Sequence, residues 1–511
     1  MKQFLFSAVL FLTITLQGFS QTVSSLIPNK PSQAPDYFCT WNIQGYTCSY
    51  NSNAEIRQAM TEKNMLGEGT YQNWVNFFPK IREDLIFVMD DSWDIPLSET
   101  SKDGPSFGLT ELNQERFPSY TGTPAERLTK LVSAVKAKGW RGLGGWICAQ
   151  EAPIVGNVNS EEYWTERLKA ANESGFAYWK VDWGKQSRNL EWRKTMTKLG
   201  RTYAPNLVIE HAFNGYTIEV SDTYRTYDVE NVTAQPVTIQ RIANLLHYQP
   251  QGDAKSIINC EDEPYIAAGL GCAIGIMRYP FPDKLPNNTN DYAFPPTGRN
   301  IKYRMDEVIR GVRWHRIAEP FGVGSENYSI DKTSLKDYWV LGERETWNKK
   351  HKPGDTLKEN APARVSRGLP LAKILNPSPD QPFVLSSMYP NGAVAVVTIG
   401  RGINREYITK RIKVEQEIQN IDNPIAIFGD YESLTLLLPT KIKASDYEVL
   451  GQDLAGDTYS YITKDIVFKD NKIIISGDLI RKVGLSSASK NDISDPGLVL
   501  KFNKKQKISS K

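Results

Sequence analysis

The sequence predicts a (β/α)8 TIM barrel followed by a C-terminal antiparallel β-sandwich domain. In the first part of the chain, short apolar runs alternate with amphipathic helical patterns, as in a barrel of parallel strands. After about residue 335 the short apolar runs follow one another with only turns between them. A chain of 511 residues is also too long for one ordinary domain. We therefore expect the barrel over 35–328 and the β-sandwich over 335–505.

The N-terminal segment has the composition of a secretory signal peptide. Lys2 precedes an apolar run of about a dozen residues, and small and polar residues follow it up to Gln21. The run is too short for a membrane anchor, and no later segment has 18 uninterrupted apolar residues. We expect 1–21 to be removed and the protein to be exported, periplasmic or secreted, without a membrane span.

Eight apolar runs are the candidate strands of the barrel. They are YFCTWN (37–42), LIFVMD (85–90), RGLGGWI (141–147), FAYWKVD (176–182), NLVIE (206–210), TYRTYD (223–228), SIINC (256–260) and CAIGIM (272–277). Helical patterns lie between them, the clearest over 124–139, where apolar residues recur with a period of 3.6. An open doubly wound sheet is the alternative, but no glycine-rich phosphate loop follows the first run.

The C-terminal domain is predicted from seven short apolar segments joined by Gly, Pro, Asn and Asp turns. They are DYWVLGE (337–343), FVLSSMY (383–389), AVAVVTIG (393–400), IAIFGDY (425–431), SLTLLLP (433–439), YEVLGQD (447–453) and KIIISG (472–477). Strands of this length and spacing are typical of an antiparallel sandwich.

Composition and cysteine content exclude several classes of function. The net charge of +3 is too small to indicate a nucleic-acid partner. The chain has 4 His and 5 Cys without C-x-x-C or HExxH spacing, so we expect no metal and no cofactor. Cys39 and Cys48 are close enough in sequence to pair, and the sequence leaves that open.

Carboxylates or amides follow five successive candidate strands, in the segments VMDDSWD, WICAQE, KVDWG, VIEHAFNGY and TYDVEN. The C-terminal ends of the strands of such a barrel meet at one face, where active sites are built. Lys180 and Asp182 are two residues apart and so point to the same side of their strand. They form either a structural ion pair or part of a site in which Lys180 keeps Asp182 ionised.

A retaining glycosidase needs a second carboxyl group about 5 Å from its nucleophile. Asp228 ends a strand two strands after Asp182 and could lie across the mouth of the barrel. It could equally cap the helix that follows. Glu230 and Asp222 are alternatives for the same role, and spacing does not separate them.

These strand ends resemble clan D of the glycoside hydrolases, the α-galactosidase and α-N-acetylgalactosaminidase group of families 27 and 36. The resemblance follows the barrel in order and, more loosely, the C-terminal domain. The matching segments are CTWN with Trp41, MDDSWD with Asp90, Asp91 and Trp93, the FP segment and helix before the third strand, KVD with Lys180 and Asp182, the fifth strand ending at Glu210, and YRTYD with Arg225 and Asp228. The family usually has a cysteine shortly after the nucleophile, where this chain has Trp183 and Gly184.

The resemblance implies a retaining exo-α-glycosidase that releases terminal galactose-like residues. Asp182 would be the nucleophile and Asp228 the acid/base. Asp90 and Asp91 would hold the 4- and 6-hydroxyls of the sugar, Lys180 a neighbouring hydroxyl and Glu210 the 2-position, with Arg225 beside Asp228. The rings of Trp41, Trp93 and Trp146 would stack on the sugar.

The sequence is also compatible with two other functions. One is a related α-glycosidase acting on α-N-acetylgalactosamine, a modified galactan or an α-glucan, although the Asp90–Asp91 pair would repel a sulfated 4- or 6-position. The other is a non-catalytic carbohydrate-binding barrel, which would need no nucleophile. In each case the partner is a carbohydrate, and the oligomeric state is not predicted.

Overall fold

The computed structural model describes residues 25–48, 52–69, 72–99, 101, 104–226, 232–277, 303–342 and 351–505. The predicted signal peptide lies outside these ranges. None of the helices within them combines the length and the apolar character needed to cross a membrane.

Eight parallel strands close into a barrel in chain order, from β1 next to β2 round to β8 next to β1. The strands are β1 (Tyr37–Cys39), β2 (Ile86–Met89), β3 (Gly142–Ile147), β4 (Tyr178–Val181), β5 (Val208–His211), β6 (Thr223–Arg225), β7 (Ile257–Glu261) and β8 (Ala273–Ile276). Each overlaps one of the eight predicted apolar runs, so the predicted barrel is confirmed.

The helices of the barrel region lie between these strands or, in the case of α9, after β8. They are α1 (Trp41–Thr47), α2 (Asn53–Gln58), α3 (Glu62–Leu66), α4 (Pro124–Ala137), α5 (Ser160–Ser174), α6 (Leu190–Tyr203), α7 (Ala234–Ala243), α8 (Pro264–Leu270) and α9 (Met305–Trp314). Helix α4 shows why they form. Thr123 and Glu126 make a capping box at its start, and its apolar stripe from Leu128 to Val135 is buried against the barrel.

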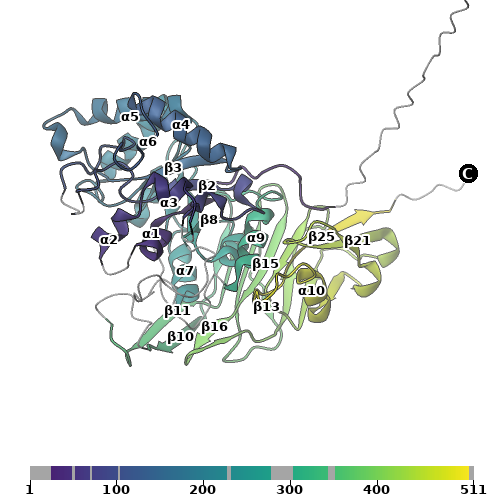
Figure 1. Ribbon diagram of the computed structural model, residues 1–511. Coiled ribbons are helices and arrows are strands. Elements are labelled where there is room, and N and C mark those ends of the chain that lie inside the picture. The colour runs from purple at the N-terminus through teal and green to yellow at the C-terminus, as the bar shows by residue number, and fades with distance from the viewer. Residues whose placement is uncertain are drawn as a thin grey trace, which may run out of the picture.

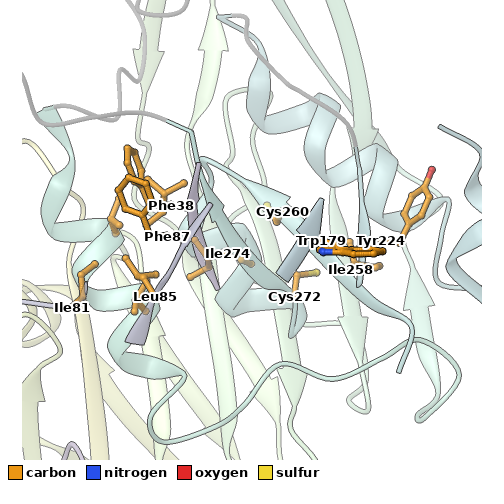
Figure 2. Packing of buried hydrophobic residues seen from close by; sticks show 14 of the residues in the cluster. Phe38, Ile81, Leu85, Phe87, Trp179, Tyr224, Ile258, Cys260, Cys272 and Ile274 are labelled. Carbon is orange, nitrogen blue, oxygen red and sulfur yellow. The ribbon is translucent and has the colours of Figure 1, made fainter. Parts of the chain in front are cut away.

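Alternate side chains of the strands face the two sides of the barrel wall. Those facing outwards pack under the helices, as the neighbouring Phe38 and Phe87 do (Figure 2), with ring centroids 5.7 Å apart. The inward-facing set begins with an apolar layer that includes Tyr37, Val88 and Tyr178. Above that layer, towards the C-terminal ends of the strands, the inward-facing side chains are charged.

The described part of the C-terminal domain contains three sheets, ordered β11-β10-β16-β17, β22-β21-β25-β19-β15-β14-β12-β9 and β13-β18-β20-β24-β23. Its elements are β9 (Tyr328–Ile330), β10 (Ser334–Val340), β11 (Thr356–Pro362), β12 (Arg364–Arg367), β13 (Lys373–Ile374), β14 (Phe383–Met388), β15 (Val394–Ile399), β16 (Arg401–Ile403), β17 (Glu406–Ile408), β18 (Lys413–Glu417), β19 (Ile425–Phe428), β20 (Ser433–Leu437), β21 (Tyr447–Asp453), β22 (Ser460–Tyr461), β23 (Val467–Lys469), β24 (Lys472–Ser476), α10 (Gly477–Gly484) and β25 (Gly497–Lys504). A β-domain follows the barrel as predicted. Its sheets are mixed rather than purely antiparallel, because β12–β14, β15–β19, β18–β20 and β10–β16 pair in parallel.

The barrel and the β-domain share one apolar core. Helix α8 is buried along its whole length and packs on β14 and β15, and the same cluster reaches from Ile274 in the barrel to Val397 in the β-domain. Figure 1 shows the small sheet of β10 and β11 beside α7, with which β11 is in contact. The β-domain therefore supports the side of the barrel that carries the β6–α7 connection.

A buried ion pair joins the two domains. Arg310 of α9 donates two hydrogen bonds to Asp453 of β21, and both side chains are fully buried. Asp453→Ala should lower the free energy of unfolding by about 3–5 kcal/mol, because it leaves the Arg310 charge buried without its partner. Asp457→Ala is the matched control, since Asp457 is 88% exposed in its ion pair with Arg313. Urea unfolding that shows equal losses for both variants would contradict this account.

Candidate active site

The charged layer lies inside the barrel at the C-terminal ends of the strands. Six inward-facing groups form it, namely Asp90, Lys180, Asp182, Glu210, Arg225 and Glu261. Five of these were predicted from the sequence. They come from five strands or the residues directly after them, namely β2, β4, β5, β6 and β7, so closing the barrel is what brings them together.

Asp182 follows β4 directly and is the most accessible of these carboxylates. Its side chain is 14% exposed, compared with 5% for Asp90 and 1% for Glu210. The indole of Trp146 donates a hydrogen bond of 2.9 Å to Oδ2, and Nη2 of Arg225 lies 3.1 Å from Oδ1. The hydrogen bond from Trp146 and the ion pair with Arg225 fix the carboxylate in the mouth.

The sequence led us to expect Lys180 beside Asp182, but the two side chains do not form an ion pair. The Nζ of Lys180 lies 2.9 Å from Oδ2 of Asp90 and 3.3 Å from the sulfur of Cys39. Burial acts to lower the pKa of Lys180, but the Asp90 carboxylate outweighs it and holds that pKa well above its ordinary value. Since β4 and β2 are not neighbours, their pairing across the interior could not be deduced from spacing along β4.

Cys39 belongs to the same group and forms no disulfide. None of the five cysteines forms a disulfide. The Cys39 thiol is 2.7 Å from Oδ2 of Asp90, and burial raises the pKa of the thiol well above its usual value. The pairing with Cys48 that the sequence left open is therefore absent, and Cys39 serves as a buried neutral donor to Asp90.

Asp91 turns away from Asp90 and binds Arg57. The guanidinium donates from Nε and Nη2 to Oδ2 of Asp91 at 3.0 and 2.8 Å. The same guanidinium lies over the rings of Phe107 and Trp183. Burial raises the pKa of Asp91 to about 6, and Arg57 works against that rise. Asp90 thus pairs with Lys180 and Asp91 with Arg57. Because each carboxylate has its own cation, both can lie near the mouth.

Arg225 of β6 links three carboxylates at the bottom of the site. Its guanidinium is fully buried and contacts Asp182, Glu210 at 3.7 Å and Glu261 at 4.0 Å. Glu210 also accepts hydrogen bonds from Tyr178 at 2.8 Å and Asn259 at 3.0 Å. This arrangement makes Glu210 a support for Arg225 beneath the mouth rather than a side chain that projects into it.

Glu261 is the site residue that our interpretation of the sequence missed. It ends β7, accepts a hydrogen bond of 2.8 Å from Tyr37 and is buried beside Arg225. The signal was present, because NCEDE places carboxylates at the end of an apolar run just as the five quoted segments do. Gly275 of β8 leaves room for the Glu261 side chain, since a Cβ at residue 275 would lie 3.0 Å from it.

Negative charge exceeds positive charge in this layer. Four carboxylates, Asp90, Asp182, Glu210 and Glu261, lie around the two cations Lys180 and Arg225. Burial raises the pKa of Glu210, while Arg225 and Lys180 lower it. A negative, water-poor site of this kind stabilises positive charge that develops on a bound substrate.

The predicted sugar-stacking tryptophans have different surroundings. Trp93 is fully buried, packs on Phe176 and donates to the backbone carbonyl of Trp146. Trp146 is also buried and holds Asp182. Trp41 at the start of α1 and Trp183 after Asp182 are partly exposed. Of these four tryptophans, only Trp41 and Trp183 therefore have accessible ring surface.

The chain departs from the family pattern at Trp183-Gly184, and the structure explains why glycine stands there. The loop docks on the end of β3, with the Ala149 amide donating to the Trp183 carbonyl at 2.8 Å. Gly184 has φ of 147°, and a Cβ there would lie 2.6–2.7 Å from the Ala149 backbone. Only glycine allows this approach two residues from Asp182.

Gly184→Ala should lower the free energy of unfolding by about 1–3 kcal/mol and reduce turnover, because the loop must move and carries Asp182 with it. Thermal unfolding and steady-state rates measure both effects. Gly252→Ala is the control, because Gly252 has φ of 62° but nothing within 4 Å of its Cβ position. If the two variants lose the same stability and activity, the contact with Ala149 has no role.

Asp228, the predicted acid/base, and its alternative Glu230 lie outside the described residues. Asp222, the third candidate acid/base, lies at the opposite end of the barrel. It precedes β6, is bound by Arg201 of α6 and accepts the amide of Ile209 at 2.9 Å. This placement removes Asp222 as a candidate for chemistry at the mouth.

No protein-family model and no curated protein matches this chain. Solved structures do. The α-galactosidase I of Mortierella vinacea is 12% identical to this chain with a TM-score of 0.41, and the match covers 92% of this chain and 97% of the α-galactosidase. A GH27 β-L-arabinopyranosidase of Geobacillus stearothermophilus is 10% identical with a TM-score of 0.38, covering 94% and 97%. An α-galactosidase of Saccharomyces cerevisiae is 10% identical with a TM-score of 0.33, covering 93% and 97%.

Proposed function

We propose that this protein is a retaining exo-α-glycosidase that releases terminal galactose-like residues, with Asp182 as nucleophile and Asp228 as acid/base. The observation that carries the proposal is the setting of Asp182. It is the most accessible carboxylate of a charged layer at the C-terminal mouth of a closed barrel, and Trp146 and Arg225 hold its two oxygens. A sugar-binding scaffold without chemistry would not need an oriented carboxylate at that point.

The chemistry follows from this setting. One oxygen of Asp182 bonds to the anomeric carbon while the bond from that carbon to the leaving oxygen breaks, and Asp228 gives its proton to the leaving oxygen. Water then gives a proton to Asp228 and displaces Asp182 from the sugar. Both transition states carry positive charge on the ring, which the excess of carboxylates in the charged layer favours.

Asp90 and Lys180 offer an acceptor and a donor to ring hydroxyls from within one ion pair. Asp91 reaches the same region from its pair with Arg57. Trp41 and Trp183 flank the mouth as apolar faces. These groups suit a neutral sugar with several hydroxyls, as the resemblance to clan D implies. A panel of nitrophenyl α-glycosides, with galactose, N-acetylgalactosamine and glucose as the sugar, separates galactosidase from the related activities.

Leaving-group dependence tests the role of Asp228. Asp228→Ala should slow a substrate with a poor, sugar-like leaving group by about 10²–10⁴-fold and an activated dinitrophenyl glycoside far less, because only the former needs a proton donor. Glu230→Ala is the matched variant and should affect both substrates alike. The opposite pattern would transfer the role to Glu230, and no loss on either substrate in both variants would contradict the proposed mechanism.

A further inference from the structure

Arg193 is a buried cation that the chemistry proposed above does not use. It belongs to α6, and its side chain is fully buried. Among the described residues, no carboxylate forms an ion pair with it. Burial lowers the pKa of Arg193 to about 10, and the Asp182 carboxylate works against that fall, so the guanidinium stays charged at neutral pH. A buried charge without a counter-ion costs stability unless hydrogen bonds replace its water.

The hydrogen bonds of Arg193 hold the loop that begins with Asp182. Nη2 donates to the backbone carbonyl of Asp182 at 3.2 Å, and Nε donates to the carbonyl of Ser187 at 2.8 Å. A longer contact of 3.5 Å runs from Nη1 to the carbonyl of Val181. On its other side, the amide of Asp182 donates to the carbonyl of Ile147 in β3 at 3.0 Å. Arg193 therefore binds the loop after β4 at two points, one of which is Asp182 itself.

This contact lies where the sheet stops fixing the backbone. The regular pairing of β4 with β5 ends with Lys180 opposite Glu210, two residues before Asp182. The hydrogen bond from Arg193 to the Asp182 carbonyl lies beyond that last pair. A side chain of α6 thus continues the support that β5 no longer gives to β4.

His211 of β5 orients the guanidinium. Nη1 of Arg193 lies 2.8 Å from Nδ1 of His211, and Nε2 of His211 lies 2.9 Å from the hydroxyl of Thr197. That hydroxyl donates to the backbone carbonyl of Arg193 at 3.1 Å. Since a guanidinium can only donate, Nδ1 is the acceptor and Nε2 carries the proton. The imidazole is therefore neutral, and burial and Arg193 both hold the pKa of His211 well below its ordinary value.

We infer that Arg193 is a positioning residue for the nucleophile of the proposed reaction, and that neutral His211 orients it. Trp146 and Arg225 fix the Asp182 side chain in the mouth, and Arg193 fixes its backbone from the outer side of the barrel wall. A displacement of about 1 Å at the reacting atom can cost about 10²-fold in rate. The role in catalysis rests on the proposed function, whereas the hold of Arg193 on Asp182 does not.

Arg193→Met should lower kcat for an aryl α-galactoside by about 10²-fold and leave the inhibition constant of galactose unchanged, because Asp90 and Lys180 keep their places. Arg201→Met is the matched control, since Arg201 also belongs to α6 but binds the buried Asp222 at the opposite end of the barrel. Both variants should unfold at lower temperatures, yet Arg201→Met should keep its turnover when both are assayed well below unfolding. Equal kcat in the two variants, or a loss of galactose binding as large as the loss in kcat, would overturn the inference.

Substitutions at His211 test the same inference with the arginine in place, and decide it if Arg193→Met does not fold. His211→Asn still presents an acceptor to Nη1 of Arg193, whereas His211→Leu has none. Turnover should fall by about tenfold in His211→Leu and be largely retained in His211→Asn. Equal kcat in these two variants would show that His211 does not orient Arg193.

The indole N–H of Trp146 reports the position of Asp182 without turnover, because it donates to Oδ2 of that carboxylate. In ¹H–¹⁵N spectra of the whole protein, with the signal assigned from Trp146→Phe, Arg193→Met should shift this signal and Arg201→Met should leave it in place. If the signal shifts but the wild type hydrolyses no α-glycoside, the positioning of Asp182 by Arg193 stands and the glycosidase assignment falls. If α-galactosides are hydrolysed and the signal stays in place in Arg193→Met, the reverse holds.

Discussion

Asp182→Ala should lower the turnover of an aryl α-galactoside by at least about 10⁴-fold and leave the fold intact. The side chain is partly exposed and follows β4 rather than filling its core, so its loss creates no closed cavity. What is lost is the group that bonds to the anomeric carbon. Steady-state rates and thermal unfolding of the same preparation give both results.

Glu191→Ala is the control for this variant, since Glu191 is an exposed carboxylate of α6. Azide offers a second check, because a small anion can enter the space left by Asp182 and attack the same face of the sugar. Turnover of an activated substrate should then return, with a β-glycosyl azide as product. A variant that keeps its rate without azide would contradict the assignment of the nucleophile.

Arg225→Met should abolish activity and lower the free energy of unfolding by about 3–5 kcal/mol at neutral pH. Methionine fills similar space but leaves Asp182, Glu210 and Glu261 without the cation that they share. Arg225→Lys keeps the charge, so it should recover part of the stability. It should recover less of the activity, because one ammonium cannot contact three carboxylates as the planar guanidinium does.

The loss of stability in Arg225→Met should depend on pH in a defined direction. Burial already raises the pKa of Glu210 in the folded protein, and Arg225 opposes that rise. Without Arg225 the pKa of Glu210 in the folded state rises further above its value in the unfolded chain. Such a group stabilises the folded state below its unfolded pKa and loses that contribution as pH rises. The deficit should therefore be small near about pH 4 and largest at about pH 7, as urea unfolding at the two pH values would show.

The sequence predicted the strands of the barrel and most charged residues at their ends, because both depend on local patterns. Apolar runs and helix caps such as Thr123 identify the elements, and a fixed barrel topology brings Asp90, Asp182 and Arg225 to one mouth. Parallel pairs in the β-domain were not predictable, since strand composition does not tell which strands become neighbours.

The sequence also could not predict which cation pairs with which carboxylate in the site. Lys180 pairs with Asp90 across the interior, and Asp182 pairs with Arg225 two strands away. Side chains of this length can reach several acceptors, so the choice depends on strand register and on depth in the barrel. Spacing within FAYWKVDWG indicated only that Lys180 and Asp182 share a face.

The configuration of the first product tests the central claim most directly. Time-resolved ¹H NMR of p-nitrophenyl α-galactoside hydrolysis follows the anomeric proton of the released sugar before mutarotation. Attack by Asp182 followed by attack of water inverts the anomeric carbon twice, so the α-anomer should appear first. If the β-anomer appears first, water attacks directly and Asp182 is not a nucleophile.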